Sequence, residues 1–179
     1  FSESGPLSAA IPHSVTNIGN EAFSYCASLA SVTIGSGVQN IGDNAFSDCM
    51  SLGEIYFAGN APSTGWAIFL NDAATVFYLP GTTGWGTNFG GSWGLDLQPT
   101  APWLPKIIAS GSSFGVHTNQ FGFDVGWASG RTIIVEACTN LANPAWTPLQ
   151  TNILASGLWH FDDPGWTNQP RRMYRIKSP

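Results

Sequence analysis

Apolar and small residues recur in the amino-terminal half of the chain with a period of 23 residues. Residues 11–33 and 34–56 are identical at eleven of 23 aligned positions, and most of the shared residues are apolar or small. A unit of this length cannot bury its own apolar face, so equivalent side chains of neighbouring coils must stack on one another. The repeat predicts a solenoid with columns of equivalent residues, among them Ile18/Ile41, Phe23/Phe46, Cys26/Cys49 and Leu29/Leu52.

The repeat weakens on both sides of this region. Phe57 and Phe69 still follow Ile34 and Phe46 at the 23-residue distance, whereas residues 1–10 fit only after one deletion. Stable solenoids usually need about three or more coils, with atypical ends. Because only two repeats are clear and the chain starts in the middle of one, we expect the sequence to belong to a larger protein.

The repeat I-P-x-S-V-T-x-I-G-x-x-A-F-x-x-C-x-x-L-x-x-V resembles the BspA-like leucine-rich repeat family of bacterial and protist surface proteins. The resemblance is close over residues 11–57 and looser over 1–10 and 58–80. It implies short strands at Leu29–Ile34 and Leu52–Phe57 on one face of a curved solenoid. It also implies extracellular adhesion or ligand binding rather than catalysis.

The implied strands present polar side chains on their outer face. Strand residues alternate between the two faces of a sheet, so the outward positions are Ser31, Thr33, Glu54 and Tyr56. These four residues are candidates for ligand binding. The alternative interpretation is that they are only solvated.

The three cysteines, Cys26, Cys49 and Cys138, are expected to be free. Equivalent residues of adjacent coils lie about 4.8 Å apart with side chains pointing the same way, whereas a disulfide needs Cβ atoms that converge to about 3.8 Å. We therefore predict that Cys26 and Cys49 are small buried core residues and that Cys138 is buried in a strand. No second Cys or His lies at the close spacing of a metal site, so no metal is expected.

Residues 58–100 lose the repeat and contain the Gly, Pro and Asn clusters typical of turns. The β-branched and aromatic stretch Thr75–Leu79 predicts one strand. We expect residues 58–100 to form the cap of the solenoid. Its tryptophans have two interpretations, a platform on which sugars stack or simple packing of the cap. On the first interpretation the candidate ligand-binding residues are Trp66, Trp85 and Trp93.

Residues 101–105 are interpreted as a stiff proline-rich linker, because proline disfavours helices and sheet ladders. From residue 106 to residue 179, period-two alternation and turn signals predict a small antiparallel β-sandwich. The expected strands are Phe121–Trp127, Thr132–Thr139, Pro148–Leu154, Leu158–Asp162 and a last strand around Tyr174 and Ile176. The stretches V-E-A-C-T-N-L-A-N-P-x-W-T and F-x-D-P and the Tyr-Arg ending resemble C-terminal β-domains of large secreted proteins of Verrucomicrobia-like bacteria. That resemblance implies no particular activity.

Charge is divided unevenly along the chain. Residues 1–105 carry seven acids and no Lys or Arg, whereas the remainder carries six bases and four acids, so −7 and +2 give the net charge of −5. Nucleic acid and anionic membranes are therefore not expected as partners, and no apolar run is long enough to span a membrane. The basic residues near the end are candidates for binding an acidic partner, including the acidic solenoid of another copy, or for protecting a sheet edge from pairing. They are Arg171, Arg172, Arg175 and Lys177.

No motif predicts catalysis. Residues 111–115 match G-x-S-x-G, but a nucleophile elbow needs a following helix, and a strand pattern follows here. His13, His117 and His160 lie apart from one another, and no calcium or phosphate loop is present. No catalytic residue and no cofactor is expected.

Together these patterns predict a mainly β chain, in which a short leucine-rich-repeat solenoid with a cap is followed by a small antiparallel β-sandwich. The repeats occupy residues 1–57, the first of them truncated. The expected function is a non-enzymatic recognition or adhesion module at a bacterial cell surface, which binds protein or glycan. The alternative is a structural subunit that assembles head to tail into a filament or surface layer, because the exposed end of a solenoid can be covered by another copy.

Overall fold

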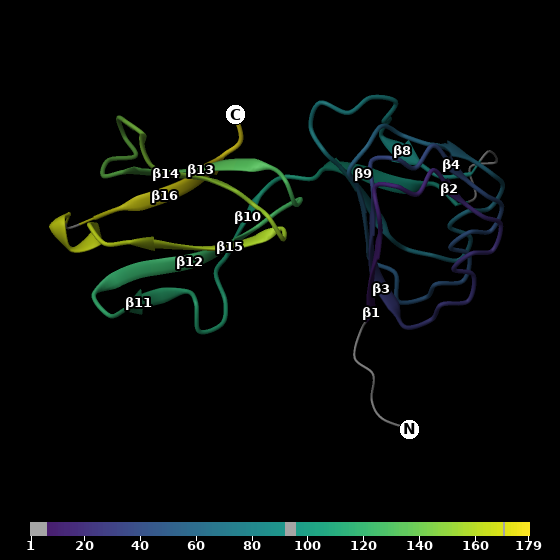
Figure 1. The fold of residues 1–179 in the computed structure, drawn as a ribbon, viewed down its shortest axis with the longest axis horizontal. Helices are drawn as coiled ribbons and strands as arrows, with labels where there is room; N and C mark the ends of the chain where they lie inside the picture. Colours follow the sequence, from purple (N-terminus) through teal and green to yellow (C-terminus); the bar gives the residue numbers. More distant parts are fainter. Residues whose placement is uncertain (1–6, 92–95, 170) are drawn as a thin grey trace, which may run out of the picture. The chain divides into compact units, whose positions relative to one another are not determined.

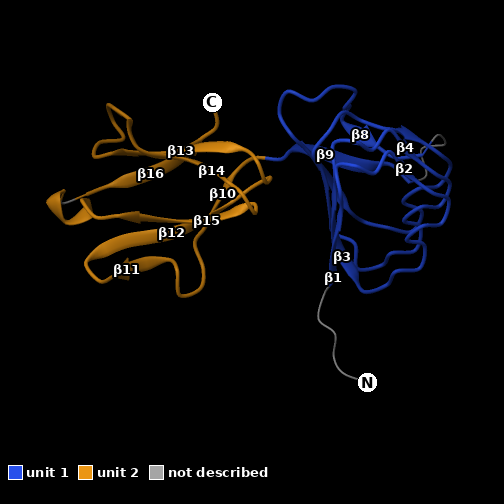
Figure 2. Cartoon of the chain, viewed as in Figure 1, with its two compact units in different colours: residues 1–103 blue, residues 104–179 orange. Residues whose placement is uncertain are grey.

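The computed structural model covers the 179-residue chain and describes residues 7–91, 96–169 and 171–179. The chain forms two compact units, Phe1–Trp103 and Leu104–Pro179, coloured separately in Figure 2. The division falls within the segment that the sequence assigns to the linker. Ala101 and Pro102 of that segment belong to a strand of the first unit.

The first unit is a β-solenoid, in which successive coils each add a strand to the same parallel sheet (Figure 1). The large sheet consists, in spatial order, of β1 (Leu7–Ile11), β3 (Leu29–Ile34), β5 (Glu54–Phe57), β7 (Thr75–Tyr78), β9 (Gln98–Pro102) and the antiparallel β8 (Asn88–Phe89). A second parallel sheet consists of the two-residue strands β2 (Asn17–Ile18), β4 (Asn40–Ile41) and β6 (Ser63–Thr64). The predicted solenoid is confirmed.

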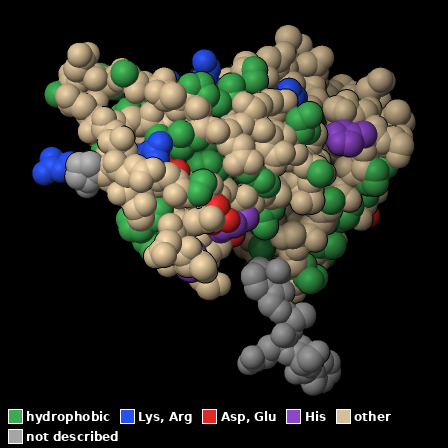
Figure 3. Space-filling model, turned by 60° about the vertical axis from the view of Figure 1, so that its left-hand side comes forward, with side chains coloured by type: hydrophobic (Ala, Val, Ile, Leu, Met, Phe, Trp, Pro, Cys, Tyr) green, Lys and Arg blue, Asp and Glu red, His purple; other side chains and the backbone are tan. Residues whose placement is uncertain are grey.

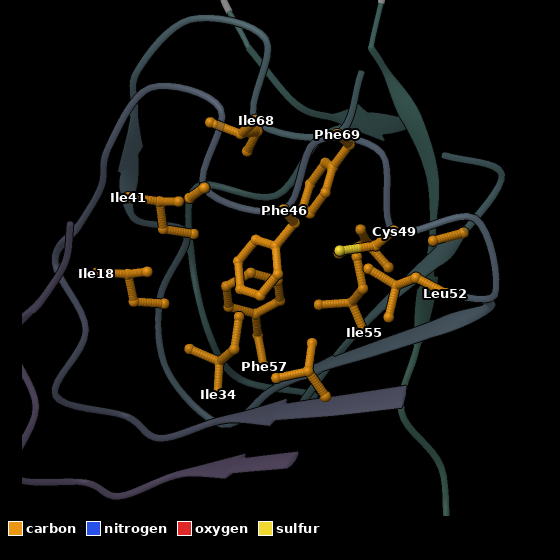
Figure 4. Packing of buried hydrophobic residues seen from close by; sticks show 14 of the residues in the cluster. Ile18, Ile34, Ile41, Phe46, Cys49, Leu52, Ile55, Phe57, Ile68 and Phe69 are labelled. Carbon is orange, nitrogen blue, oxygen red and sulfur yellow. The ribbon is translucent and has the colours of Figure 1, made fainter. Parts of the chain in front are cut away.

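Equivalent apolar residues form continuous columns between the coils. Phe23 stacks on Phe46 with ring centroids 5.1 Å apart, and Phe46 stacks on Phe69 at 5.8 Å. Ile18 is paired with Ile41 in register. Figure 4 shows Phe46 and Phe69 pointing into the interior that the coils enclose. The phenylalanine and isoleucine columns predicted from the 23-residue period are therefore confirmed, and burial of their apolar surface stabilises the stack at about 25 cal/mol per Å².

Polar columns tie the coils together along the second sheet and in the turns that follow its strands. The Asn40 side-chain amide donates to Asn17 Oδ1 at 2.8 Å, and Ser63 of the next coil donates its hydroxyl to Asn40. Beside this column, Asn20 Oδ1 accepts the backbone N–H of Asp43 at 3.0 Å. An amide side chain both donates and accepts, which explains why the repeat holds asparagine at both positions of the first pair.

Residues 58–100 continue the solenoid before they close it. β7 pairs in parallel with β5, but Phe57 faces Tyr78 at a spacing of 21 residues instead of 23. This shorter coil is the reason that a search at constant period loses the repeat here. Trp85 and Phe89 then pack on Phe57, with centroid distances of 4.9 and 5.3 Å, and shield the last apolar layer.

The cysteines are free, but the prediction for Cys26 is wrong. Cys49 and Cys138 are buried, whereas Cys26 is exposed. Cys49 lies one coil further along, where its Sγ donates to the carbonyl oxygen of Phe23 at 3.0 Å. Burial raises the pKa of Cys49 to about 11. Cys26 and Cys49 thus share a repeat position but differ in burial. Residues 29–53 stack on one side of the first coil, which contains Cys26, and no described residue stacks on its other side.

Asp72 is an unfavourably placed acid in the third coil. Neither oxygen of its partly buried carboxylate makes a hydrogen bond of good geometry within the described residues, although the Cys49 backbone lies close to it. Burial raises the pKa of Asp72 from 3.8 to about 7, with the nearby Asp48 adding to the shift and the Cys49 backbone opposing it. The folded state thus binds the proton more tightly than the unfolded chain, so the resulting stability is fully present below pH 3.8 and is lost as the pH rises through about 7.

We expect Asp72→Asn to raise the free energy of unfolding of the first unit by about 1–2 kcal/mol at about pH 8, a value reduced for solvent screening of a partly exposed group. At about pH 4 the substitution should have little effect, because the folded protein already holds the neutral acid there. Amide hydrogen exchange of peptides from the first unit, at both pH values, measures this difference. An equal effect at the two pH values would show that charge is not the cause.

The second unit consists of two antiparallel sheets, as predicted for a sandwich (Figure 1). In one sheet β12 (Gln120–Gly126) pairs with β10 (Lys106–Ile108), β11 (Gly115–His117) and β15 (Leu158–Asp163). In the other, β13 (Thr132–Cys138) lies between β14 (Thr147–Ile153) and β16 (Met173–Lys177). Phe121 of one sheet stacks on Tyr174 of the other at 5.3 Å. The sequence predicts the five longer strands and misses β10, β11 and the short 3₁₀ helix η1 (Trp166–Asn168).

Candidate functional site on the outer strand face

The parallel register gathers one residue of each coil into rows on the outer surface of the large sheet. One row contains Ser8, Ser31, Glu54 and Thr75. The adjacent row contains Ala10, Thr33, Tyr56, Phe77 and Ala101. We call these two rows, with Trp103, the outer strand face. All four strand residues that the sequence singles out lie in it.

Alternation along each strand separates this face from the core. Val32 and Ile55 are fully buried, whereas Thr33 and Tyr56 are half-buried and Glu54 is exposed. The β-branched and aromatic side chains favour the strand, and the apolar columns fix which side of it faces inward. The sheet therefore holds the outer row positions at regular strand spacings of about 4.8 Å.

Hydroxyl and carboxylate groups form the first row. Ser8 Oγ and Ser31 Oγ are hydrogen-bonded at 2.8 Å, and Tyr56 donates its phenolic O–H to Glu54 Oε2 at 2.7 Å. Burial, helped by the bond to Glu54, raises the pKa of Tyr56 above its ordinary value. The phenol thus stays protonated and keeps the carboxylate oriented, while the other Glu54 oxygen can accept a bond from a partner.

Aromatic rings form the second row at the same place. Tyr56 stacks on Phe77 with centroids 5.0 Å apart, and Trp103 lies 4.8 Å from Tyr56 in a tilted arrangement. Large rings held by their neighbours give contact area at a small cost in side-chain entropy. The rings can bind an apolar surface or the apolar face of a sugar, while the neighbouring carboxylate and hydroxyls bind hydrogen-bond donors of the same partner.

The electrostatics of the first unit select neutral or cationic groups. Residues 1–105 contain seven acids and no Lys or Arg, so an anionic partner would meet no compensating charge there. The Lys and Arg side chains coloured blue in Figure 3 all belong to the second unit, because the first basic residue of the chain is Lys106. A partner with amide, hydroxyl or basic groups fits the outer strand face best.

The two candidate tryptophans that the structure describes, Trp66 and Trp85, are not gathered with this face. Trp66 is exposed after β6 of the second sheet, and its backbone N–H donates to Asp43. Trp85 is half-buried and packs against the core, stacked on Tyr78 at 5.4 Å, and its Nε1 donates to Thr82. Trp93 lies outside the described residues. The contacts of Trp85 are those of cap packing.

The basic residues of the second unit are partly engaged within it. Arg172 pairs with Asp163 at 2.9 Å, and Arg175 pairs with Glu136 at 2.6 Å while it lies over the Trp146 ring. Within the described part of the chain, Arg171 and Lys177 have no ion pair. β16 is an edge strand, so its charged side chains are placed where they hinder unwanted sheet pairing.

The G-x-S-x-G motif is not a nucleophile elbow, because its turn leads into the strand β11 instead of a helix. Ser113 and His160 bond to the same carboxylate, Asp124, instead of to each other, and Asp124 accepts from His160 Nδ1 at 2.7 Å. This bond raises the pKa of His160. Among the described residues no group of three or more His, Cys, Asp or Glu side chains is arranged to hold a metal ion.

Sequence reasoning misses six of the ten residues of the outer strand face, including Phe77 and Trp103. A signal for Phe77 was present. Thr75–Tyr78 repeats the pattern of Glu54–Phe57, with apolar residues at the inward positions and an aromatic residue at the third position. Allowing a coil of 21 residues aligns the two strands. Trp103 carries no such signal, because it follows the last strand and reaches Tyr56 across two coils.

A parallel sheet that gains one short strand per coil of about 23 residues, with stacked aromatic and asparagine columns, defines a leucine-rich-repeat type of solenoid. Residues 1–84 match the family model described as "BspA type Leucine rich repeat region (6 copies)". This supports the family resemblance for the amino-terminal part of the chain. No curated protein and no solved structure matches the chain significantly.

Repeats of this family are typically protein-interaction modules and are commonly associated with bacterial surfaces. Among the described residues, no helix has the length and apolar character to cross a membrane.

Proposed function

We propose that the first unit is a recognition module of a bacterial cell surface, which binds a protein or glycan through the outer strand face. One observation carries the proposal: the register of β3, β5 and β7 places Glu54, Tyr56 and Phe77 side by side on a rigid sheet. Sites on strands hold their side chains more firmly than sites on loops. The acidic character of the unit favours partners rich in amide, hydroxyl or basic groups.

The chemistry of the face suits a partner that presents an apolar surface with donors at its rim. Stacked rings supply the apolar contact. The free oxygen of Glu54 and the hydroxyl of Thr33 supply directional bonds at the edge of the rings. No catalytic group takes part.

The test is binding of the intact chain to a glycan array and to a panel of immobilised extracellular proteins. The variant Glu54→Arg reverses a charge on the outer strand face, and Glu21→Arg makes the same change at an exposed position in a turn of the first coil. We expect Glu54→Arg to weaken every genuine binding signal about tenfold or more, a loss of about 1.4 kcal/mol, and Glu21→Arg to leave it within about twofold.

Two outcomes contradict the proposal. If Glu54→Arg binds as well as the unchanged chain, the outer strand face is not the site. If both variants lose binding equally, the interaction is a general response to net charge. Loss on Trp66→Ala with retention on Glu54→Arg would instead locate the site on the second sheet.

Head-to-tail self-assembly is the second proposal, favoured by the charge difference between the two units. The ion pairs that Arg172 and Arg175 form within the second unit reduce the positive charge available to attract the acidic solenoid of another copy. We therefore propose recognition ahead of self-assembly. Light scattering over a range of concentrations, with electron microscopy, separates the two. Filaments or concentration-dependent growth in mass support assembly, and a constant monomer mass at high concentration excludes it.

A further inference from the structure

The second unit contains a cavity that plays no part in the function proposed above. It has a volume of about 490 Å³, within the range of roughly 300–1,000 Å³ typical of small-molecule sites. It opens where strands β10 and β12 of one sheet lie opposite β16 of the other. The lining residues that matter are Ile107, Phe114, Phe121, Trp166, Arg171 and Arg172.

The body of the cavity is aromatic. Phe114 meets Phe121 edge-on at 5.6 Å, and Tyr174, which also lines the cavity, stacks on Phe121 at 5.3 Å. Trp166 is held in place because its Nε1 donates to the carbonyl oxygen of Asn119 at 2.9 Å. Phe114 remains 41% exposed, so the open cavity leaves aromatic surface in water that a flat apolar ligand would cover.

The lining of the cavity carries positive charge. Both arginines line it, and none of its lining residues is acidic. Arg172 is fixed by its ion pair with the buried Asp163, which also accepts the Tyr174 hydroxyl at 2.9 Å. Because the two guanidinium groups of Arg171 and Arg172 are balanced by only the Asp163 carboxylate, an excess positive charge remains. Arg171 is exposed and has no ion pair within the described residues.

We propose that this cavity binds a small aromatic carboxylate. Its ring lies against Phe114 and Phe121, and its carboxylate bonds to the guanidinium of Arg171, with the fixed Arg172 adding to the attraction. Planar guanidinium groups bind carboxylates with two parallel hydrogen bonds. The ligand class follows from the combination, because an apolar slot alone would accept neutral rings equally well.

The experiment compares naphthoate with naphthylmethanol, which has a similar ring system but no charge, in titrations of the intact chain followed by calorimetry and protein NMR. We expect saturable binding of naphthoate that is about fivefold or more tighter than that of the alcohol. Arg171→Gln should remove this preference while leaving the alcohol's affinity unchanged. Lys177→Gln is the matched control, because it removes a basic charge from β16 that does not line the cavity.

Phe114→Ala should weaken both compounds about fivefold or more, since it removes the shared ring contact. Absence of saturable binding by either compound overturns the proposal, as does equal affinity for the two in the unchanged chain. Equal losses for Arg171→Gln and Lys177→Gln would reduce the effect to net charge and also overturn it. Glu54→Arg should leave naphthoate binding unchanged, so this test and that of the outer strand face fail independently.

Discussion

Phe46→Ala is expected to lower the free energy of unfolding of the first unit by about 3–5 kcal/mol. Phe46 is fully buried and stacks between Phe23 and Phe69. Truncation removes the ring from both contacts and leaves a cavity in the middle of a continuous column. Because neighbouring coils are bound to each other through polar columns as well, they cannot collapse freely into the space.

The repeat supplies a matched control for this prediction. Phe23 occupies the equivalent position in the first coil but is only half-buried, so Phe23→Ala should cost about half as much. Amide hydrogen exchange of peptides from the first unit measures both effects, and peptides from the second unit serve as an internal reference. If the two substitutions cost the same, the stacked column is not what stabilises the solenoid.

The 23-residue period of the sequence predicts the solenoid because residues at equal spacing along the chain occupy equivalent places in successive coils and therefore stack on one another. Phe23 and Phe46 occur 23 residues apart and lie one above the other. The same logic fails where coil length changes, as between Phe57 and Tyr78. It also fails for Cys26, which shares its repeat position with Cys49 but is exposed. Periodicity specifies which residues are equivalent, whereas burial depends on what lies above and below each coil.

For the candidate sites too, the sequence predicts the residues that follow a regular pattern and misses those that the fold brings together from distant positions. Strand alternation places Ser31, Thr33, Glu54 and Tyr56 on the outer strand face, and the structure has them there in register. The cavity of the second unit has no counterpart in the sequence pattern. Its walls come from residues as far apart as Ile107 and Tyr174, which two sheets of a sandwich bring together without any repeat. Arg171 could be selected from the sequence for its charge, but not for its aromatic neighbours.

Gly42→Ala is expected to lower the free energy of unfolding of the first unit by about 2–3 kcal/mol, the cost of overpacking a rigid contact. A Cβ atom at this position would lie 2.3 Å from Asn20 Oδ1 and 2.6 Å from the Asn20 backbone nitrogen. Neither atom can move away easily, because Asn20 Oδ1 accepts the backbone N–H of Asp43 from the same coil as Gly42. The methyl group would therefore push the two coils apart.

Gly19 is the matched control, since it holds the equivalent position one coil earlier and a Cβ there would meet nothing within 4 Å. Gly19→Ala should be neutral or stabilising by up to about 1 kcal/mol, because alanine restricts the unfolded chain. Denaturant titration followed by hydrogen exchange of the first unit compares the pair. If both glycines tolerate alanine equally, the close approach of successive coils is not the reason that the repeat has glycine at this position.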